Sequence, residues 1–451
     1  MKIHIKNATA VWTGNSEAVS GFVIEDNVIS ELIPVGGEPG VSVDEVFDAS
    51  GLVITPGLIN CHHHFYQTLT RAFPSALNKE LFPWLVALYP VWAGLDEEAV
   101  EVSTELALAE LMLSGCTLAS DHHYLFTDAT SQAIDIQVSV ANRLGVRVVL
   151  TRGSMSLGKS AGGLPPDSVV QDSDTILEES ERLIGLFHQA DKYAMTQIAV
   201  APCSPFSVTD DLMRDSAALA RKHKVLLHTH LAETEDENAF CLDRVGKRPL
   251  AYLQDLDWVS DDVWFAHGIH FDDAEVATLG NAGVAICHCP SSNMLLASGI
   301  CRTKELEEAG CAIGLGVDGS ASNDGSNMMQ EVRQAFLLQR IRYGAAQVSH
   351  EDALRWGTKG GASLFKRPEL GSIAKGQAAD LAFFDLDELR FSGSGDPIAA
   401  LVLCGAHRVR HLMVAGEWRV KDFEIPGLDL SLLKSRHRQA ASRLAQRMVS
   451  P

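Results

Sequence analysis

The sequence predicts an α/β protein, a (β/α)8 TIM-like barrel with a small β-sandwich formed from both chain ends. Three observations carry this prediction: short apolar runs recur eight times, most of them end in a polar tip, and helical stretches separate several of them. Alternating strands and helices also fit a doubly wound sheet, but eight units with polar tips favour the barrel. A chain of 451 residues is long enough for one large domain and a smaller one.

The two chain ends alternate in polarity. Segments such as "SGFVIEDNVISEL" near the start and "GSIAKGQAADLAFFDL" near the end have a period of two, with turn residues between the segments. This period is typical of half-buried strands. We therefore expect residues 1–55 and 370–425 to form one β-sandwich domain, with a hydrolase barrel of residues 56–369 inserted between its halves.

Eight apolar runs are the candidate barrel strands. In chain order they are "LVITPGLIN", "CTLASD", "VRVVLTRG", "QIAVAPCSP", "KVLLHTH", "VWFAHGIH", "VAICHCP" and "CAIGLGVD". Residues 96–115 have helical apolar spacing and a glycine stop at Gly115, and residues 172–190 are similar. A helix is expected after the eighth strand, with Met328 and Met329 in the core. Residues 426–451 are expected to form a final amphipathic helix.

Composition and charge exclude several classes of protein. The net charge of −21 repels phosphate backbones, so we expect no nucleic-acid partner. No apolar run reaches the roughly 20 residues that span a membrane, and the start lacks a signal-peptide pattern. Nine cysteines without CxxC pairs indicate reduced thiols. We expect a cytoplasmic protein without membrane contact, and a homo-oligomer.

Three consecutive histidines follow the first candidate strand, in "PGLINCHHHFYQTL". Successive side chains of a strand point to opposite faces, so His62 and His64 share a face and His63 points away. If the first barrel strand ends here, His62 and His64 face the barrel mouth together.

Residues suited to metal binding or acid–base chemistry end three further strands. His230 ends the fifth strand with Glu233 three residues on, His267 ends the sixth, and Asp318 ends the eighth. Histidines and a carboxylate make a mixed nitrogen and oxygen site suited to zinc or ferrous iron. His228 shares a face with His230, so one of the two is a bystander. We favour His230 as the ligand because it lies nearer the end of its strand.

This set of motifs resembles the amidohydrolase superfamily over nearly the whole chain. Many members hold two metals bridged by a carboxylated lysine on the fourth strand, but "QIAVAPCSPF" has no lysine. The chain therefore resembles the one-metal aminohydrolase branch. The resemblance implies one divalent metal, zinc or alternatively iron, with His62, His64, His230 and Asp318 as ligands.

The resemblance also implies roles in deamination. Glu233 would shuttle protons to the ring nitrogen and to the leaving ammonia, and it would touch the substrate. Asp318 would be ligand and base together, and His267 would orient or polarise the attacking hydroxide. We expect Glu235 and Glu237, in the run "ETEDE", to be exposed surface acids.

Several residues bear on which heterocycle is bound. Gln67, in "HHHFYQ", resembles the purine-binding glutamine of guanine deaminases. The fourth strand ends in "PCSPF", where those enzymes carry an arginine–phenylalanine pair, and Cys203 and Ser204 supply no guanidinium. We expect Cys203 to bind the substrate instead, with Ser204 or a backbone carbonyl as the alternative, by accepting from a ring N–H or donating to a ring oxygen. Residues 65–94 are rich in aromatic side chains that suit a lid over a flat ring, although a subunit interface or local core is an equal alternative. For His122 and Tyr124, which share a face, pocket contact is left open.

The whole set most resembles 8-oxoguanine deaminases, relatives of guanine deaminases and triazine hydrolases. The resemblance implies hydrolysis of 8-oxoguanine, a small heterocyclic substrate, to urate and ammonia. The alternatives are a triazine amino- or chlorohydrolase of the hydroxyatrazine type, a guanine deaminase, and a catalytically dead scaffold. Retention of all six candidate ligands and catalytic residues speaks against the scaffold.

Overall fold

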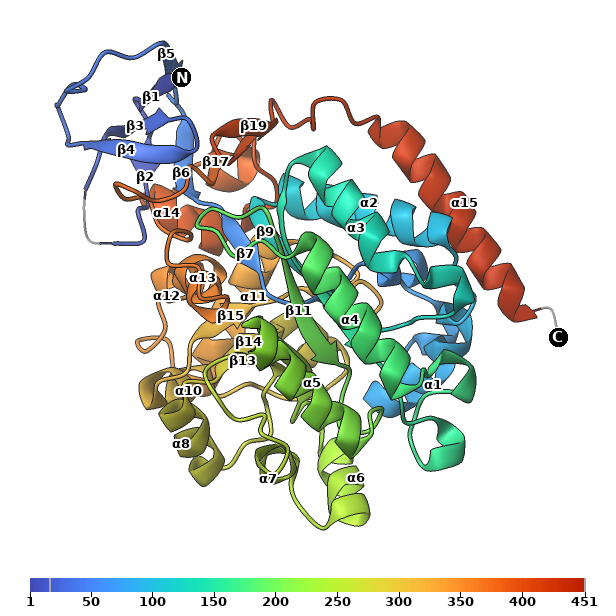
Figure 1. Cartoon of the computed structure of the whole chain (residues 1–451). Coiled ribbons are helices and arrows are strands. Elements are labelled where there is room, and N and C mark those ends of the chain that lie inside the picture. The colour runs from blue at the N-terminus through green and yellow to red at the C-terminus, as the bar shows by residue number, and fades with distance from the viewer. Residues whose placement is uncertain (16–17, 450–451) are drawn as a thin grey trace.

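A closed barrel of parallel strands is the centre of the molecule, as the sequence predicts (Figure 1). The computed structural model describes residues 1–15 and 18–449. Within these residues the strands follow the order β10-β11-β12-β13-β14-β15-β7-β9 around the barrel. They are β7 (Leu58–Asn60), β9 (Cys116–His123), β10 (Arg147–Ser154), β11 (Thr196–Pro202), β12 (Leu227–Leu231), β13 (Val263–His267), β14 (Ala285–His288) and β15 (Ile313–Leu315).

Helices surround the barrel and bury their apolar faces against it. They are α1 (Leu81–Trp92), α2 (Glu97–Leu113), α3 (Ala133–Leu144), α4 (Ser173–Phe187), α5 (Asp210–His223), α6 (Glu235–Val245), α7 (Pro249–Gln254), α8 (Asp273–Ala282), α9 (Pro290–Leu295), α10 (Thr303–Ala309), α11 (Met328–Tyr343), α12 (His350–Arg355) and α13 (Gly361–Leu364). Met328 and Met329 on α11 are fully buried, as expected. Among the described residues, no helix has the length and apolar character needed to cross a membrane.

Two sheets built from both chain ends lie beside the barrel, at the upper left of Figure 1. One sheet has the order β4-β3-β1-β5 and the other β19-β18-β17-β6-β2. Ile5, Phe22, Ile54 and Phe383 belong to one buried cluster that draws on both sheets. The strands are β1 (Lys2–Lys6), β2 (Ala10–Val11), β3 (Gly21–Glu25), β4 (Val28–Ile33), β5 (Glu45–Asp48), β6 (Leu52–Pro56), β17 (Leu381–Asp385), β18 (His411–Val414) and β19 (Glu417–Val420). The domain boundaries given above stay a prediction.

The run "LVITPGLIN" is two strands, and its interpretation as one barrel strand was wrong. Its first part is β6, which pairs antiparallel with β17 in the end sheet, and only β7 enters the barrel. The chain passes from sheet to barrel at Gly57, where a Cβ atom would lie 2.0 Å from Thr117 Oγ1. A glycine is therefore required at this crossing.

Short elements at the carboxyl ends of the barrel strands position the three consecutive histidines, residues 62–64. β8 (His63–His64) pairs in parallel with β16 (Asp318–Gly319), and the 3₁₀ helix η1 (Phe65–Thr70) follows at once. The ends of the first and eighth barrel units are thereby tied together at the carboxyl ends of the strands.

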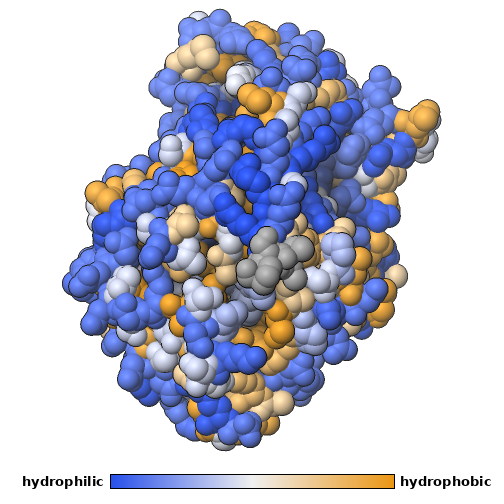
Figure 2. Space-filling view, turned by 90° about the vertical axis from the view of Figure 1, so that its right-hand side faces the viewer, coloured by the Kyte–Doolittle hydropathy of each residue, from blue (hydrophilic) through white to orange (hydrophobic). Residues whose placement is uncertain are grey.

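The final helix α15 (Leu430–Val449) runs along the right side of Figure 1. It packs against α1, α2 and η1, and His437 Nε2 lies 3.0 Å from Thr68 Oγ1 of η1. Figure 2 shows this side of the molecule, where hydrophilic residues dominate the upper part and hydrophobic residues are interspersed below. Hydrophobic residues scattered in this way are normal for a protein surface.

Candidate active site

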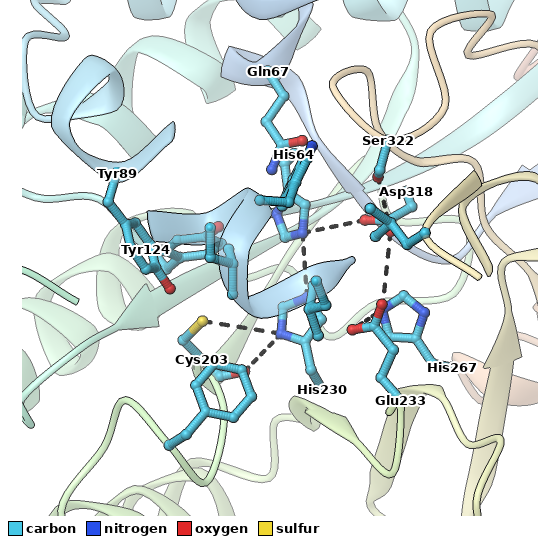
Figure 3. A pocket seen from close by; sticks show the side chains of 15 residues that line it. His64, Gln67, Tyr89, Tyr124, Cys203, His230, Glu233, His267, Asp318 and Ser322 are labelled. Atoms are coloured by element: carbon cyan, nitrogen blue, oxygen red, sulfur yellow. Dashed lines mark hydrogen bonds and ion pairs between the residues drawn. The ribbon is translucent and has the colours of Figure 1, made fainter. Parts of the chain in front are cut away.

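A cavity opens at the carboxyl ends of the barrel strands, where the predicted residues gather (Figure 3). It has about 380 Å³ of free volume, part of which is open to solvent. Its lining consists of His64, Gln67, Leu81, Trp84, Leu85, Tyr89, Tyr124, Cys203, Phe206, His230, Glu233, His267, Leu296, Asp318 and Ser322. Polar groups converge on one side, and apolar and aromatic side chains form the other. This combination is typical of a small-molecule site.

His64 and His230 face each other through nitrogens that both carry lone pairs. His64 Nδ1 lies 2.7 Å from the carbonyl oxygen of His122, and His230 Nδ1 lies 2.6 Å from that of Cys203. A carbonyl only accepts, so each Nδ1 carries the proton and each Nε2 is left as an acceptor. The two Nε2 atoms are nevertheless 3.2 Å apart.

His62 joins this group through a relay of ring nitrogens. His228 donates from Nδ1 to the carbonyl of Trp264 at 2.9 Å, so its Nε2 accepts from His62 Nδ1, also at 2.9 Å. The remaining His62 Nε2 is buried and lies 3.3 Å from Asp318 Oδ1, as does His64 Nε2. His228, the bystander of the sequence analysis, thus fixes the tautomer of His62.

The arrangement fits a bound cation. Neutral histidines would place three lone pairs and a carboxylate oxygen against one another, which is unfavourable unless a cation lies among them. Burial lowers the pKa of His230 to about 3 and that of His62 well below its ordinary value, which favours the neutral form of these two rings. Three imidazoles and one carboxylate form a donor set that suits a divalent metal.

Two overlapping groups of three side chains also present ligand atoms within 4.8 Å of one another. They are His62 with His122 and His230, and His62 with His267 and Asp318. His122 Nε2 lies 2.9 Å from the carbonyl of Ala201, so that nitrogen is a donor. The backbone carbonyl of His122 also orients His64, and its Nδ1 is buried without a hydrogen-bond partner.

Glu233 and His267 lie side by side at the edge of the cavity. Glu233 Oε2 is 3.4 Å from His267 Nε2, and Glu233 Oε1 accepts from Ser298 Oγ at 3.3 Å. Burial raises the pKa of Glu233. Burial opposes protonation of His267, but the carboxylates of Glu233 and Asp318 outweigh it and raise the pKa of His267. A buried carboxyl group with a raised pKa, beside a histidine, is a candidate for general acid–base catalysis.

Asp318 has one oxygen toward the histidines and one toward a pair of serines. Its Oδ2 accepts from Ser292 Oγ at 2.6 Å, and Ser292 contacts Ser322 at 2.9 Å. His267 is held in turn by Asn293 Oδ1, which lies 2.9 Å from its Nδ1. These three polar residues follow strands β14 and β16, and the sequence analysis did not give them a role.

The backbone is strained at the strand ends that carry the site. Ala232, His267 and Asp318 have φ values of 54°, 72° and 61°, in the left-handed region that residues other than glycine rarely adopt. Such strain persists only where the surrounding contacts determine the conformation, and it gathers at functional sites.

Some of the residues considered for substrate contact line the cavity, and others do not. Gln67 and Cys203 both line the cavity, and Gln67 Oε1 is buried without a hydrogen-bond partner. Ser204 is absent from the lining, and its hydroxyl contacts that of Ser207 at 2.7 Å. Tyr124 lines the cavity, whereas His122 lies behind it.

Most of the aromatic side chains in residues 65–94 do not line the cavity, so they do not form a continuous lid over it. Trp84 and Tyr89 line it. Phe65, Tyr66 and Trp92 are buried in the adjoining core, and Phe73 and Phe82 are half-buried against that core. Local core is therefore the correct interpretation for most of these residues.

Glu237 is buried, and its prediction as an exposed surface acid was wrong. Its side chain is inaccessible to solvent, and burial raises its pKa to about 7. The physical reason is that the carboxylate turns back to the start of α6 and accepts backbone N–H groups there. The spacing Thr234-x-x-Glu237 matches a capping box, but the Thr234 side chain makes no cap hydrogen bond, and Glu237 accepts from Ala232 and Glu233 instead.

Comparison with known proteins agrees with the fold. Residues 53–419 match the amidohydrolase family. An 8-oxoguanine deaminase from Pseudomonas aeruginosa is 58% identical over 98% of each chain. A hydroxydechloroatrazine ethylaminohydrolase from Pseudomonas sp. strain ADP is 37% identical over 88% of this chain and 83% of the relative.

A solved structure extends the likeness to the geometry. The atrazine chlorohydrolase from Arthrobacter aurescens TC1, complexed with zinc, superposes with a TM-score of 0.92 at 29% identity, over 97% of this chain and 100% of the other. On the matched residues, the identity to relatives and the shared barrel, this chain belongs to the amidohydrolase family.

Proposed function

We propose that this protein is a metal-dependent deaminase that hydrolyses 8-oxoguanine to urate and ammonia. The observation that carries the proposal is the 58% identity, over 98% of both chains, to a relative that bears that activity in its name. The cavity supports it, because aromatic side chains and a wall of acid–base groups line it together, as a site for a planar heterocycle requires. The homo-oligomeric state and the cytoplasmic location expected from the sequence stay predictions.

The metal would be held by His62, His64, His230 and Asp318, and zinc is the metal we favour over iron. When bound, it would polarise a water molecule so that the water attacks at neutral pH. Each histidine already has its Nδ1 occupied, so its Nε2 is directed to the ion without reorganisation.

The chain's own side chains would move the protons. Asp318 would accept a proton from the attacking water, and His267, beside both carboxylates, would hold that water in line with the ring carbon. Glu233 would protonate the ring nitrogen next to the attacked carbon and then carry a proton to the departing amine. The bond between that carbon and the exocyclic nitrogen breaks, and a carbon–oxygen bond replaces it, which gives urate and ammonia.

Gln67 and Cys203 would select the purine. The amide of Gln67 can both donate to a ring carbonyl and accept from a ring N–H, and its unpartnered oxygen lines the cavity. Guanine presents a lone pair at N7, whereas 8-oxoguanine presents an N–H there and a carbonyl beside it. Among the described residues, the cavity lining contains no arginine or lysine to donate to guanine N7.

We expect kcat/KM for 8-oxoguanine to exceed that for guanine by a factor of about 5–150, because leaving one buried polar group unpaired costs about 1–3 kcal/mol. The test is a comparison of kcat/KM for 8-oxoguanine, guanine, isocytosine and a hydroxytriazine with the metal-loaded enzyme. Guanine as the equal or better substrate would contradict the proposal. Turnover of triazines alone would instead favour a hydroxyatrazine-type aminohydrolase, the activity named for the 37% identical relative.

Gly319→Ala is expected to weaken substrate binding by displacing Gln67. A Cβ atom at Gly319 would lie 1.8 Å from Gln67 Oε1, and the flexible amide can move away, so the fold should persist. We expect KM to rise by a factor of about 5–150 from the lost hydrogen bonds, with a smaller change in kcat. Steady-state kinetics check this, with Gly325→Ala, at a glycine with no atom closer than 3.7 Å to its Cβ position, as the control. An unchanged KM in Gly319→Ala would show that Gln67 does not bind the substrate.

A further inference from the structure

We infer that Glu237 is a positioning residue for deamination, which acts by fixing the backbone that carries Glu233. The inference rests on the proposed function, in which Glu233 carries the protons. Glu237 itself is not among the side chains that line the cavity.

The contact is a two-point clamp. Glu237 Oε1 accepts from the backbone N–H of Ala232 at 3.0 Å, and Oε2 accepts from that of Glu233 at 3.1 Å. Both carboxylate oxygens are therefore used on consecutive peptide groups. The carboxylate is buried, so water does not compete for these donors.

The clamped peptide is also the link to the next strand end. The carbonyl of Ala232 accepts from the N–H groups of Ile269 and His270, both at 2.9 Å. Ala232 is held in a left-handed conformation, with φ of 54°. Its peptide is thus fixed on one side by Glu237 and on the other by the turn that follows His267.

The clamp therefore sets the relative position of two groups in the cavity. Glu233 follows β12 and His267 ends β13, and their polar atoms are 3.4 Å apart. If one side of the link at Ala232 is released, the strained residue can relax toward an ordinary conformation. Glu233 would then move relative to His267, and proton transfer is sensitive to displacements of about 1 Å.

The test is Glu237→Gln in the metal-loaded enzyme. A glutamine offers one accepting oxygen, and its NH₂ group would face the second backbone N–H, so one arm of the clamp is lost. We expect kcat to fall by about 10²-fold, the effect of a displacement near 1 Å, with KM within about twofold and the metal content unchanged. Asp236→Asn, an exposed acid in the first turn of the same helix, is the matched control and should retain wild-type kinetics.

A double-mutant cycle separates positioning from general structural damage. If Glu237 acts through Glu233, then Glu233→Gln with Glu237→Gln should be no slower than Glu233→Gln alone, because the group being positioned has already lost its function. A further fall of about 10²-fold in the double variant would overturn the inference. So would wild-type kcat in Glu237→Gln.

Crystal structures of the variants give a readout that does not depend on turnover. The Glu233 carboxylate should shift away from His267 in Glu237→Gln and stay in place in Asp236→Asn. An unmoved carboxylate would overturn the inference whatever the substrate. Failure of the proposed function is a different result: the wild-type enzyme would prefer another heterocycle of the panel, and the kinetic cycle would be run on that compound.

Discussion

Glu233→Gln is expected to lower kcat by about 10²–10⁴-fold, the range for the loss of one general acid–base group, while the metal stays bound. A fall beyond this range would follow if Glu233 serves several proton transfers in one turnover. Glutamine has nearly the same shape and keeps an acceptor for Ser298, so the cavity should be preserved. The measurement is kcat for 8-oxoguanine together with elemental analysis of the variant.

The neighbouring acid supplies the control for this substitution. Glu235 starts α6, its side chain is 74% exposed, and it contacts His270 and the buried Asn238. Glu235→Gln removes the same charge two residues away and should retain near wild-type turnover. If Glu233→Gln also turned over at that rate, another group would have to move the protons.

His62→Ala and His230→Ala are each expected to reduce the metal content from about one ion per chain to near zero and to abolish deamination. Each substitution removes one of the converging Nε2 atoms, and His62→Ala also leaves His228 without its partner. Ligand binding stabilises the native state, so a chelator should lower the melting temperature of the wild-type enzyme and leave that of both variants unchanged. Two stoichiometric metals in fully active wild-type protein would contradict the one-metal assignment.

His63 offers a matched control within the same three histidines. It is buried, but its Nδ1 accepts from the backbone N–H of His64 at 2.7 Å, and it joins none of the converging nitrogens. His63→Asn keeps an acceptor near that position, so it should retain both metal and activity, as we also expect of His63→Ala if the smaller side chain is tolerated. Loss of the metal in His63→Asn would mean that the assignment within the triplet is wrong.

The sequence predicts the barrel and the gathering of the site because both follow from local rules. Strand ends of a barrel meet at one edge, so His64, His230, His267 and Asp318 could be brought together without knowledge of any contact. The alternation rule also separated His63 from its neighbours. The rule assumed that the three histidines belong to the first barrel strand. That strand, β7, ends at Asn60, and pairing of β8 with β16 sets the directions of His63 and His64.

The residues that sequence reasoning missed depend on contacts between elements distant in the chain. Asn293 reaches His267 and Ser292 reaches Asp318 only after β14, β13 and β16 are assembled. A third case is Asp121, whose buried carboxylate accepts from the N–H of Phe65 at 2.5 Å and so holds the turn that leads to Gln67. Small polar residues of this kind look like ordinary loop or strand residues in one dimension. Their roles come from the partners that the fold supplies.

The contact between His437 and Thr68 has a consequence for how the enzyme matures during synthesis. The two residues are 369 positions apart, and Thr68 belongs to the turn that presents Gln67. At about 5–20 residues per second, a ribosome needs on the order of 20–70 s to travel between them. Nascent chains that lack the last helix would therefore carry His62, His64 and His230 but lack the contact that braces the turn of Gln67.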